Sequence, residues 1–258
     1  MKKDYHVGFR MPYTLENLEK YIKEAQLQGI EEIAIMEPSV KFHEFANLYD
    51  EIRKTHYKQD EWYLKKATHS LSEYLNFVKE MKQQSFPIKI KFGLCIDYLS
   101  QKEAFIHKMI KETKLDLYTG RVYFLDNTAF SWNPDSFQML WDKYHASYLV
   151  RKYYEQVHAL ITSKMFHGLA DFELIHTLNV PHYFSLERTY QKIAKLLAQQ
   201  HMYVEADTSY IFRHKKASMN LTESFKNKCK QMRVECILVS NALHPIEVGL
   251  YFDRYKED

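Results

Sequence analysis

One stretch of the chain, residues 88–96, reads Ile-Lys-Ile-Lys-Phe-Gly-Leu-Cys-Ile and is typical of a β-strand. A segment with apolar residues at helical spacing, from Tyr74 to Met81, precedes it, and Pro87 separates the two. Short apolar runs and longer helical segments alternate in this way along most of the chain, which predicts an α/β fold with a parallel sheet. Six further strands are predicted, at residues 5–9, 32–36, 121–125, 166–170, 202–206 and 236–239. Seven such strands favour a barrel over an open sheet.

The composition excludes several classes of protein. The 258 residues carry a net charge of only +3, so nucleic acid and acidic membranes are not expected as partners. Three cysteines without framework spacing, and no apolar run long enough to cross a membrane, are consistent with a cytoplasmic protein. No glycine-rich nucleotide-binding motif is present. Because no linker-like stretch or internal repeat divides the chain, a single domain over residues 1–258 is expected.

Polar residues stand where the predicted strands end. In a βα barrel, the side chains that bind ligands lie at the carboxyl ends of the strands. The residues at or near these positions are rich in His, Asp, Glu and Asn, the types that bind hard and borderline metal ions. They include Asp4, His6, Glu37, Cys95, Asp97, Tyr123, Asp171, Glu205, Asp207, Arg213, Asn241 and His244.

A resemblance to a known family begins after the last strand. Ser240-Asn241-Ala242-Leu243, followed by residues 247–252 (Glu-Val-Gly-Leu-Tyr-Phe), is similar to a Ser-Asp-Ala-His segment and its acidic-Val-Gly-aromatic tail. That pattern belongs to histidinol-phosphate phosphatases of the polymerase and histidinol phosphatase (PHP) superfamily. The resemblance implies a distorted seven-stranded (β/α) barrel resembling a TIM barrel. It also implies a trinuclear centre of divalent metal (Zn, Fe or Mn) and hydrolysis of a phosphomonoester such as histidinol phosphate.

Three motifs in the first half of the chain carry the resemblance further. The opening Asp-Gly-His-x-His is similar to residues 4–8, which keep His6 and have Gly8 in place of the second imidazole. The acid–His pair after the second strand resembles Glu37-Pro38, where only the acid is kept. The Gly-x-Glu-x-Asp-Tyr motif resembles residues 93–98, with Cys95 at the position of a bridging carboxylate.

The remaining motifs lie in the second half. Tyr123 matches the strand-four His, and residues 171–175 resemble His-x-Asp-Leu-Ile, so that Asp171 replaces an imidazole. Residues 207–213 resemble an Asn-Thr-Ser-Gly-x-Arg stretch with one extra residue. This match implies that Arg213 helps to hold the substrate phosphate, a task that suits the planar guanidinium.

The replacements argue against a complete metal centre. Three clustered divalent ions need several carboxylates and imidazoles, and at the matched positions only His6 and Glu37 are unchanged. A reduced site is the alternative, since one metal could be held by His6, Glu37, Asp171 and Asn241. Cys95 and His244 are further candidate ligands. His244 could serve only if it, and not Leu243, faces the site.

Two functions follow from this pattern. The preferred hypothesis is a PHP-like protein that is catalytically impaired or a pseudoenzyme and that binds a small phosphorylated ligand or a protein partner. It would hold divalent metal substoichiometrically or not at all. The alternative is an active metal-dependent phosphomonoesterase with Glu37 and Asp171 as catalytic residues and Arg213 on the phosphate. A hydrolase that uses a changed set of residues in the same pocket is a third interpretation.

Each candidate also has a purely structural explanation. His6 could be a hydrogen-bonded histidine at a strand end, and Glu37 could pair with a neighbouring Lys or Arg. Cys95 on an apolar strand suits a small buried side chain. Arg213 could belong to a solvated basic run, and His244 could be a loop residue before Pro245.

Overall fold

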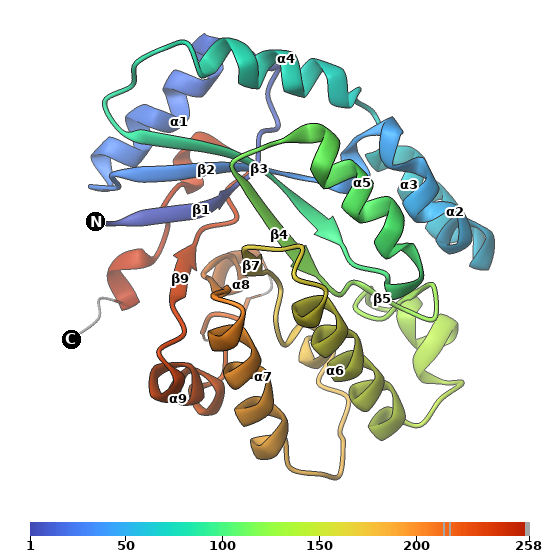
Figure 1. Ribbon diagram of the computed structural model, residues 1–258. Helices are drawn as coiled ribbons and strands as arrows, with labels where there is room; N and C mark the ends of the chain where they lie inside the picture. Colours follow the sequence, from blue (N-terminus) through green and yellow to red (C-terminus); the bar gives the residue numbers. More distant parts are fainter. Residues whose placement is uncertain (214, 217, 256–258) are drawn as a thin grey trace.

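The computed structural model describes residues 1–213, 215–216 and 218–255. Its main sheet has seven parallel strands in the order β1-β2-β3-β4-β7-β8-β9 (Figure 1). The segment after β9 returns to β1, where Val7 bridges Ala242 in parallel and the amide of Gly8 donates to the carbonyl of Ala242 over 2.7 Å. The strands therefore form a nearly closed barrel, as predicted. Their bounds are β1 Lys3–Val7, β2 Glu32–Pro38, β3 Lys89–Asp97, β4 Leu117–Arg121, β7 Gly168–Leu169, β8 Tyr203–Asp207 and β9 Cys236–Val239.

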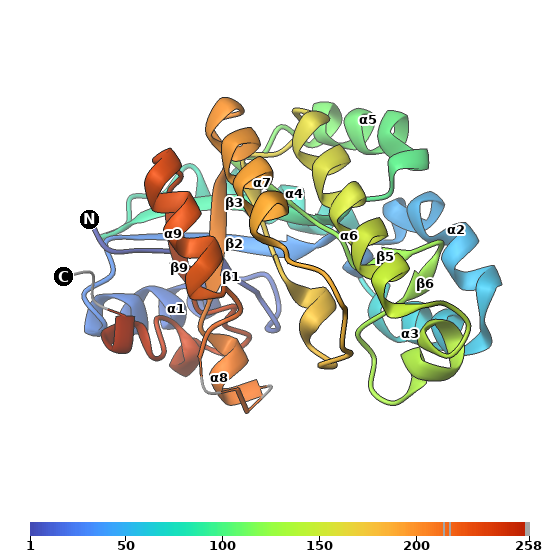
Figure 2. The ribbon, with the colours of Figure 1, turned by 90° about the horizontal axis from the view of Figure 1, so that it is seen from below.

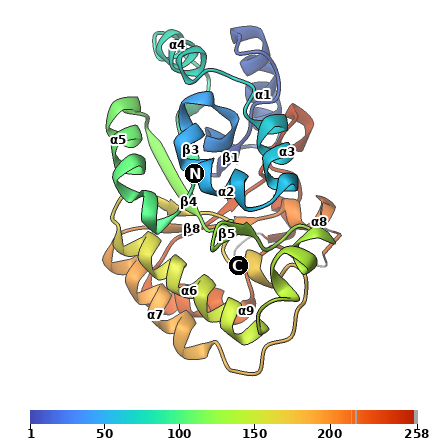
Figure 3. The same cartoon turned by 90° about the vertical axis from the view of Figure 1, so that its right-hand side faces the viewer.

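Helices surround the strands. Figures 2 and 3 show α6, α7 and α9 on one side of the sheet and α1 on the other. A short hairpin of β5 (Phe124–Leu125) and β6 (Thr128–Ala129) follows β4. The helices are α1 Leu15–Leu27, α2 Ala46–Thr55, α3 Tyr57–Lys66, α4 Leu71–Met81, α5 Glu103–Thr113, α6 Ala146–Thr162, α7 Glu187–Gln199, α8 Ser209–Arg213 and α9 Glu223–Met232. Within the described residues, no helix combines the length and the apolar character needed to cross a membrane.

Helix α1 shows how local sequence sets the element bounds. The Thr14 hydroxyl accepts a hydrogen bond from the amide of Asn17 and so caps the first turn. Leu18, Tyr21, Ile22 and Ala25 are buried on one face of the helix. Gly29 has a φ of +66°, which ends the helical path at little steric cost because glycine has no Cβ.

Side chains fill the barrel below the strand ends. A compact apolar cluster gathers residues from five strands there: Tyr5, Ala34, Met36, Leu117, Tyr203, Ile237 and Val239. Two glycines make room for it. A Cβ on Gly93 would lie 2.2 Å from the carbonyl oxygen of Leu117, and a Cβ on Gly168 would lie 2.3 Å from the ring of Tyr203. The barrel is therefore packed, and ligands can approach only at its ends.

The fourth strand differs from the prediction. It was expected at residues 121–125 but runs over Leu117–Arg121, and residues 124–125 belong to the hairpin. Val122, Phe124 and Leu125 are buried, and Phe124 packs against Tyr49 of α2 and Trp62 of α3. A pattern of apolar residues does not distinguish such burial from burial in a sheet. The other six strands lie where they were predicted, with bounds shifted by up to two residues at either end.

Candidate functional site

Two buried ionisable groups meet at the carboxyl ends of β1 and β8. The Nδ1 atom of His6 lies 2.8 Å from Oε2 of Glu205. Burial lowers the pKa of His6, but the charges of Glu205, Asp171 and Asp207 outweigh this effect and raise it to about 9. In the charged form both ring nitrogens carry protons, so the ring must lose one before it can bind a metal.

Of the two carboxylate oxygens of Glu205, only Oε2 has a hydrogen-bond partner among the described residues. Its side chain is 2% exposed, and Oε1 has no hydrogen-bond partner among the described residues. A buried carboxylate oxygen without a partner is costly. It is the clearest orphan acceptor at this end of the barrel.

Asp207 lies two residues further along β8. Its Oδ1 accepts from the amide of Ser209 over 2.7 Å, and its Oδ2 accepts from Nδ2 of Asn241 over 3.1 Å. Burial and the charge of Asp171 raise the pKa of Asp207 to about 6. An amide at position 241 donates to this carboxylate, whereas a second acid there would repel it.

Arg121, the last residue of β4, links two acids. Its Nε lies 2.6 Å from Oδ1 of Asp97, and its Nη1 lies 3.2 Å from Oδ2 of Asp171. The guanidinium also lies over the ring of Tyr123, 4.7 Å from the ring centre. Burial lowers the pKa of Arg121, but the two carboxylates outweigh it, so the pKa is raised and the charge is permanent. Asp171 is thus ion-paired.

Glu37, at the end of β2, is paired with a lysine. Its Oε2 lies 2.9 Å from Nζ of Lys41, and its Oε1 accepts from the amide of Phe9. Lys41 also donates to the carbonyl of Phe9 over 2.7 Å. Burial raises the pKa of Glu37 and the ammonium opposes that rise. The pairing with a neighbouring cation that the sequence allowed is therefore present.

The loop after β9 settles the register that the sequence left open. Leu243 turns towards β1, and a Cβ on Gly8 would lie 3.1 Å from its Cδ2 atom. His244 is exposed. Arg213 pairs with Glu247 over 2.7 Å, and the same carboxylate oxygen accepts from the amide of Leu243. Arg213 thus braces this loop.

Cys95 lies in the interior and is fully buried. Burial raises the pKa of its thiol well above the ordinary value, and the charges of Glu205 and Asp171 add to the rise although Arg121 opposes it. A neutral, inaccessible thiol is a poor nucleophile. The geometry agrees with the interpretation of Cys95 as a small buried side chain.

A family model described as the PHP domain matches residues 4–209. The chain belongs to the PHP domain family. Comparison with curated proteins gave no match to the sequence.

Solved structures show the same fold. A provisionally assigned histidinol phosphatase, HisK, from Listeria monocytogenes superposes with a TM-score of 0.76 at 14% identity, over 98% of this chain and 100% of its own. The histidinol phosphate phosphatase HisK from Lactococcus lactis, in complex with Zn, L-histidinol and phosphate, gives a TM-score of 0.63 at 14% identity, over 99% of this chain and 90% of its own. At this identity the likeness establishes the barrel fold alone.

The donors of this PHP domain do not fit a trinuclear metal centre. Two of the acids at matched positions, Glu37 and Asp171, already face side-chain cations. Gly8 and Leu243, which stand at two matched imidazole positions, have no side-chain atom that binds a metal, and a Cβ on Gly8 would lie 3.1 Å from Leu243 Cδ2. Across residues 1–213, 215–216 and 218–255, no three His, Cys, Asp or Glu side chains are grouped as a metal site. The structure brings His6, Asp171 and Asn241 around Glu205 and Asp207, and leaves Glu37 in a separate pair.

Sequence reasoning placed Glu205 and Asp207 at a strand end but gave neither a role, and it missed Arg121 and Lys41. The two acids stand two residues apart on β8, so their side chains point to the same face of the sheet. This spacing is visible in the sequence and could have identified them as a pair. Arg121 was missed because strand four was predicted at residues 121–125. That prediction put Arg121 at the start of the strand, whereas it is the last residue of β4. Lys41 is four residues from Glu37, but the short 3-10 helix that turns it back was not predicted.

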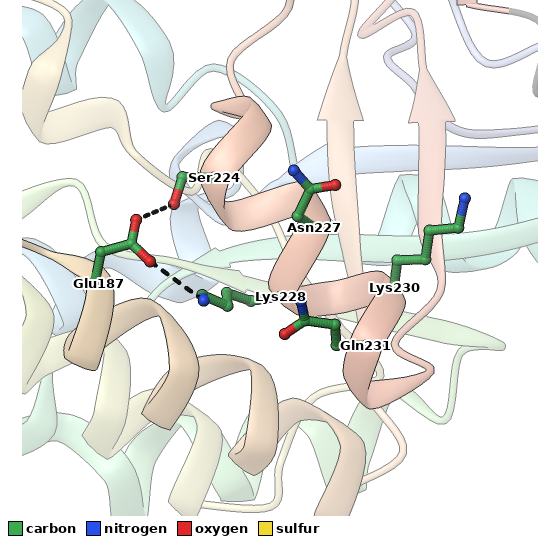
Figure 4. A pocket seen from close by; sticks show the side chains of 6 residues that line it. All are labelled: Glu187, Ser224, Asn227, Lys228, Lys230 and Gln231. Carbon is green, nitrogen blue, oxygen red and sulfur yellow. Dashed lines mark hydrogen bonds and ion pairs between the residues drawn. The ribbon is translucent and has the colours of Figure 1, made fainter.

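Two surface hollows lie away from these residues. One, of about 390 Å³, lies between α7 and α9 and contains an ion pair of Glu187 with Lys228 (Figure 4). The other, of about 260 Å³, lies beside α1 and residues 84–87. Neither is lined by any of the residues predicted for the site.

Proposed function

We propose that this PHP-family protein is histidinol-phosphatase-like in fold but impaired in metal-dependent hydrolysis, and that it binds a small phosphorylated molecule at the carboxyl ends of its strands. One observation carries the proposal. Glu37 and Asp171, the acids at matched ligand positions, are each paired with a side-chain cation, Lys41 and Arg121. These cations offset carboxylate charge that divalent ions would otherwise offset.

The proposed ligand class rests on two supports. The relative from Lactococcus lactis is described with L-histidinol and phosphate bound. In the present chain, Lys41 and Arg121 lie after β2 and at the end of β4, where the ligands of βα barrels bind. Cationic side chains bind phosphate groups through charge-assisted hydrogen bonds.

The alternative is an active phosphomonoesterase with a reduced metal site. The observation in its favour is the unpartnered Oε1 of Glu205, buried beside His6 and near Asp171 and Asp207. These four residues and Asn241 would hold a single divalent ion (Zn, Fe or Mn), which when bound would supply a Lewis acid. The protein groups themselves would position the substrate and neutralise its phosphate.

Elemental analysis of tag-free protein, together with phosphate release from L-histidinol phosphate, tests the proposal. We expect substoichiometric metal after incubation with Zn²⁺, Mn²⁺ or Fe²⁺, and release no faster than in an Asp171→Asn variant. Stoichiometric metal with turnover that a chelator abolishes would contradict the proposal. If that turnover also disappears in Glu205→Gln, the reduced-site alternative is supported.

A further inference from the structure

Lys41 joins two loops at the mouth of the barrel. Its ammonium donates to the carbonyl of Phe9 in the loop after β1. Its own carbonyl accepts from the amides of Thr68 and His69, both over 3.1 Å, in the segment after α3. Arg10 directly follows Phe9, and Lys66, the last residue of α3, stands two residues before Thr68, so both segments are tied to Lys41.

A stack of aromatic rings joins α3 to Arg121. Trp62 lies one helical turn before Lys66, so the two side chains share a face of the helix. The ring of Trp62 stacks on Tyr123, with centres 6.3 Å apart. Arg121 covers Tyr123 in turn, at 4.7 Å. Trp132 fixes the tyrosine further, because its Nε1 donates to the Tyr123 hydroxyl over 3.2 Å. The stack thus connects the face of α3 that carries Lys66 to the guanidinium of Arg121.

The positive charge of this group is incompletely balanced. In the part of the chain that the structure describes, neither the Arg10 nor the Lys66 side chain forms an ion pair or a hydrogen bond, and both residues are exposed. Partial burial of its ammonium, and then the charges of Arg10 and Arg121, lower the pKa of Lys66. Lys66 is therefore repelled by both Arg10 and Arg121, and a bound anion would relieve the repulsion.

We propose that Arg10, Lys66 and Arg121 form a site for the phosphate group of a phosphate monoester, in place of Arg213, which is occupied by Glu247. Arg121 is held in position by Asp97, Asp171 and Tyr123, and its Nη2 has no hydrogen bond to another described residue. Arg10 and Lys66 supply the charge that is not already paired. The inference rests on the proposed function, since it specifies how that ligand is held.

The test is calorimetric titration of the full-length protein with L-histidinol phosphate and with inorganic phosphate, using L-histidinol as the probe that lacks the phosphate. We expect binding of the first two only. Arg10→Ala and Lys66→Ala should each weaken the Kd about tenfold or more, as expected for the loss of a charge-assisted contact. Lys65→Ala removes the same charge from the neighbouring position and should leave the Kd within about twofold.

Several outcomes would overturn the site. These are no binding of either phosphate probe, an unchanged Kd in both variants, an equal loss in Lys65→Ala, or a loss confined to Arg213→Ala. An unchanged Kd in Arg10→Ala and Lys66→Ala, with phosphate still bound, would reject only the site. Metal-dependent turnover of L-histidinol phosphate would instead reject the proposed function, whatever the variants do to binding.

Discussion

The guanidinium of Arg121 lies 3.2 Å from the carboxylate of Asp171. The family resemblance assigns a metal-binding imidazole to position 171. The same guanidinium contacts Asp97, which is fully buried. The guanidinium at the carboxyl end of β4 thus stands between Asp97 at the end of β3 and Asp171 in the loop that follows β7.

Replacement of Arg121 by alanine should therefore be strongly destabilising. It would leave Asp97 buried without its cation, and the loss of one partner of a buried ion pair costs about 3–5 kcal/mol. Urea unfolding of the wild type and the variant measures this difference. Lys54→Ala removes a cation that is paired with Glu51 at the surface and should leave the unfolding midpoint unchanged. A similar, small effect of both substitutions would show that Arg121 does not hold these acids together.

Gly8 and Leu243 should be coupled energetically. A methyl group on Gly8 would lie 3.1 Å from Leu243 Cδ2 and 3.2 Å from the carbonyl of Ala242, closer than ordinary contacts. Gly8→Ala should cost about 1–3 kcal/mol of stability through overpacking. In a double-mutant cycle, Leu243→Ala should recover part of that cost, because it removes one of the two close atoms. Strictly additive effects would mean that the two side chains do not compete for the same space.

His176 should make the stability pH-dependent. Its Nε2 lies 3.0 Å from the hydroxyl of Tyr154. Burial, and then the charge of His182, lower its pKa to about 4 from the ordinary 6.5. Between these values the unfolded chain binds the proton more strongly, so the contribution of His176 to stability is present above pH 6.5 and is lost as the pH falls towards 4.

The size of this effect is at most about 3 kcal/mol, given 1.36 kcal/mol for each unit of pKa shift. Denaturant unfolding of the wild type and of His176→Gln at pH 7 and pH 4.5 isolates it, since the glutamine does not titrate. The stability difference between the two proteins should shift in favour of the variant at the lower pH. Parallel pH profiles for both proteins would rule out the contribution.

Cys95 should be unreactive in the folded protein. Its thiol is buried, and its pKa is raised above the ordinary value. Iodoacetamide at pH 8 should modify Cys95 only after unfolding, as peptide mass spectrometry would show. Cys236 is partly exposed and serves as the internal comparison. Rapid labelling of Cys95 in the native state would contradict this prediction and show that the thiol is accessible.

The sequence by itself determined the barrel. Apolar runs that alternate with helical stripes place six of the seven strands, and the order of short motifs from Asp4 to Phe252 points to the PHP family. These features are local and recur along the chain, so that each strand–helix unit independently indicates the same fold. The polar residues at strand ends follow from the same rule, because parallel strands present their carboxyl ends together.

Only the tertiary structure decided how these residues are partnered. Lys41 and Glu37 are close in sequence, but Arg121 and Asp171 are 50 residues apart, and His6 and Glu205 are 199 residues apart. A charge on one strand gives no sign of which charge on another strand will neutralise it, since that depends on register and rotamer. Because strand four was predicted a few residues too late, Tyr123 was assigned to the site in place of Arg121. Whether an acid is a free ligand or half of an ion pair is a property of the closed barrel, because burial and distance set its energy.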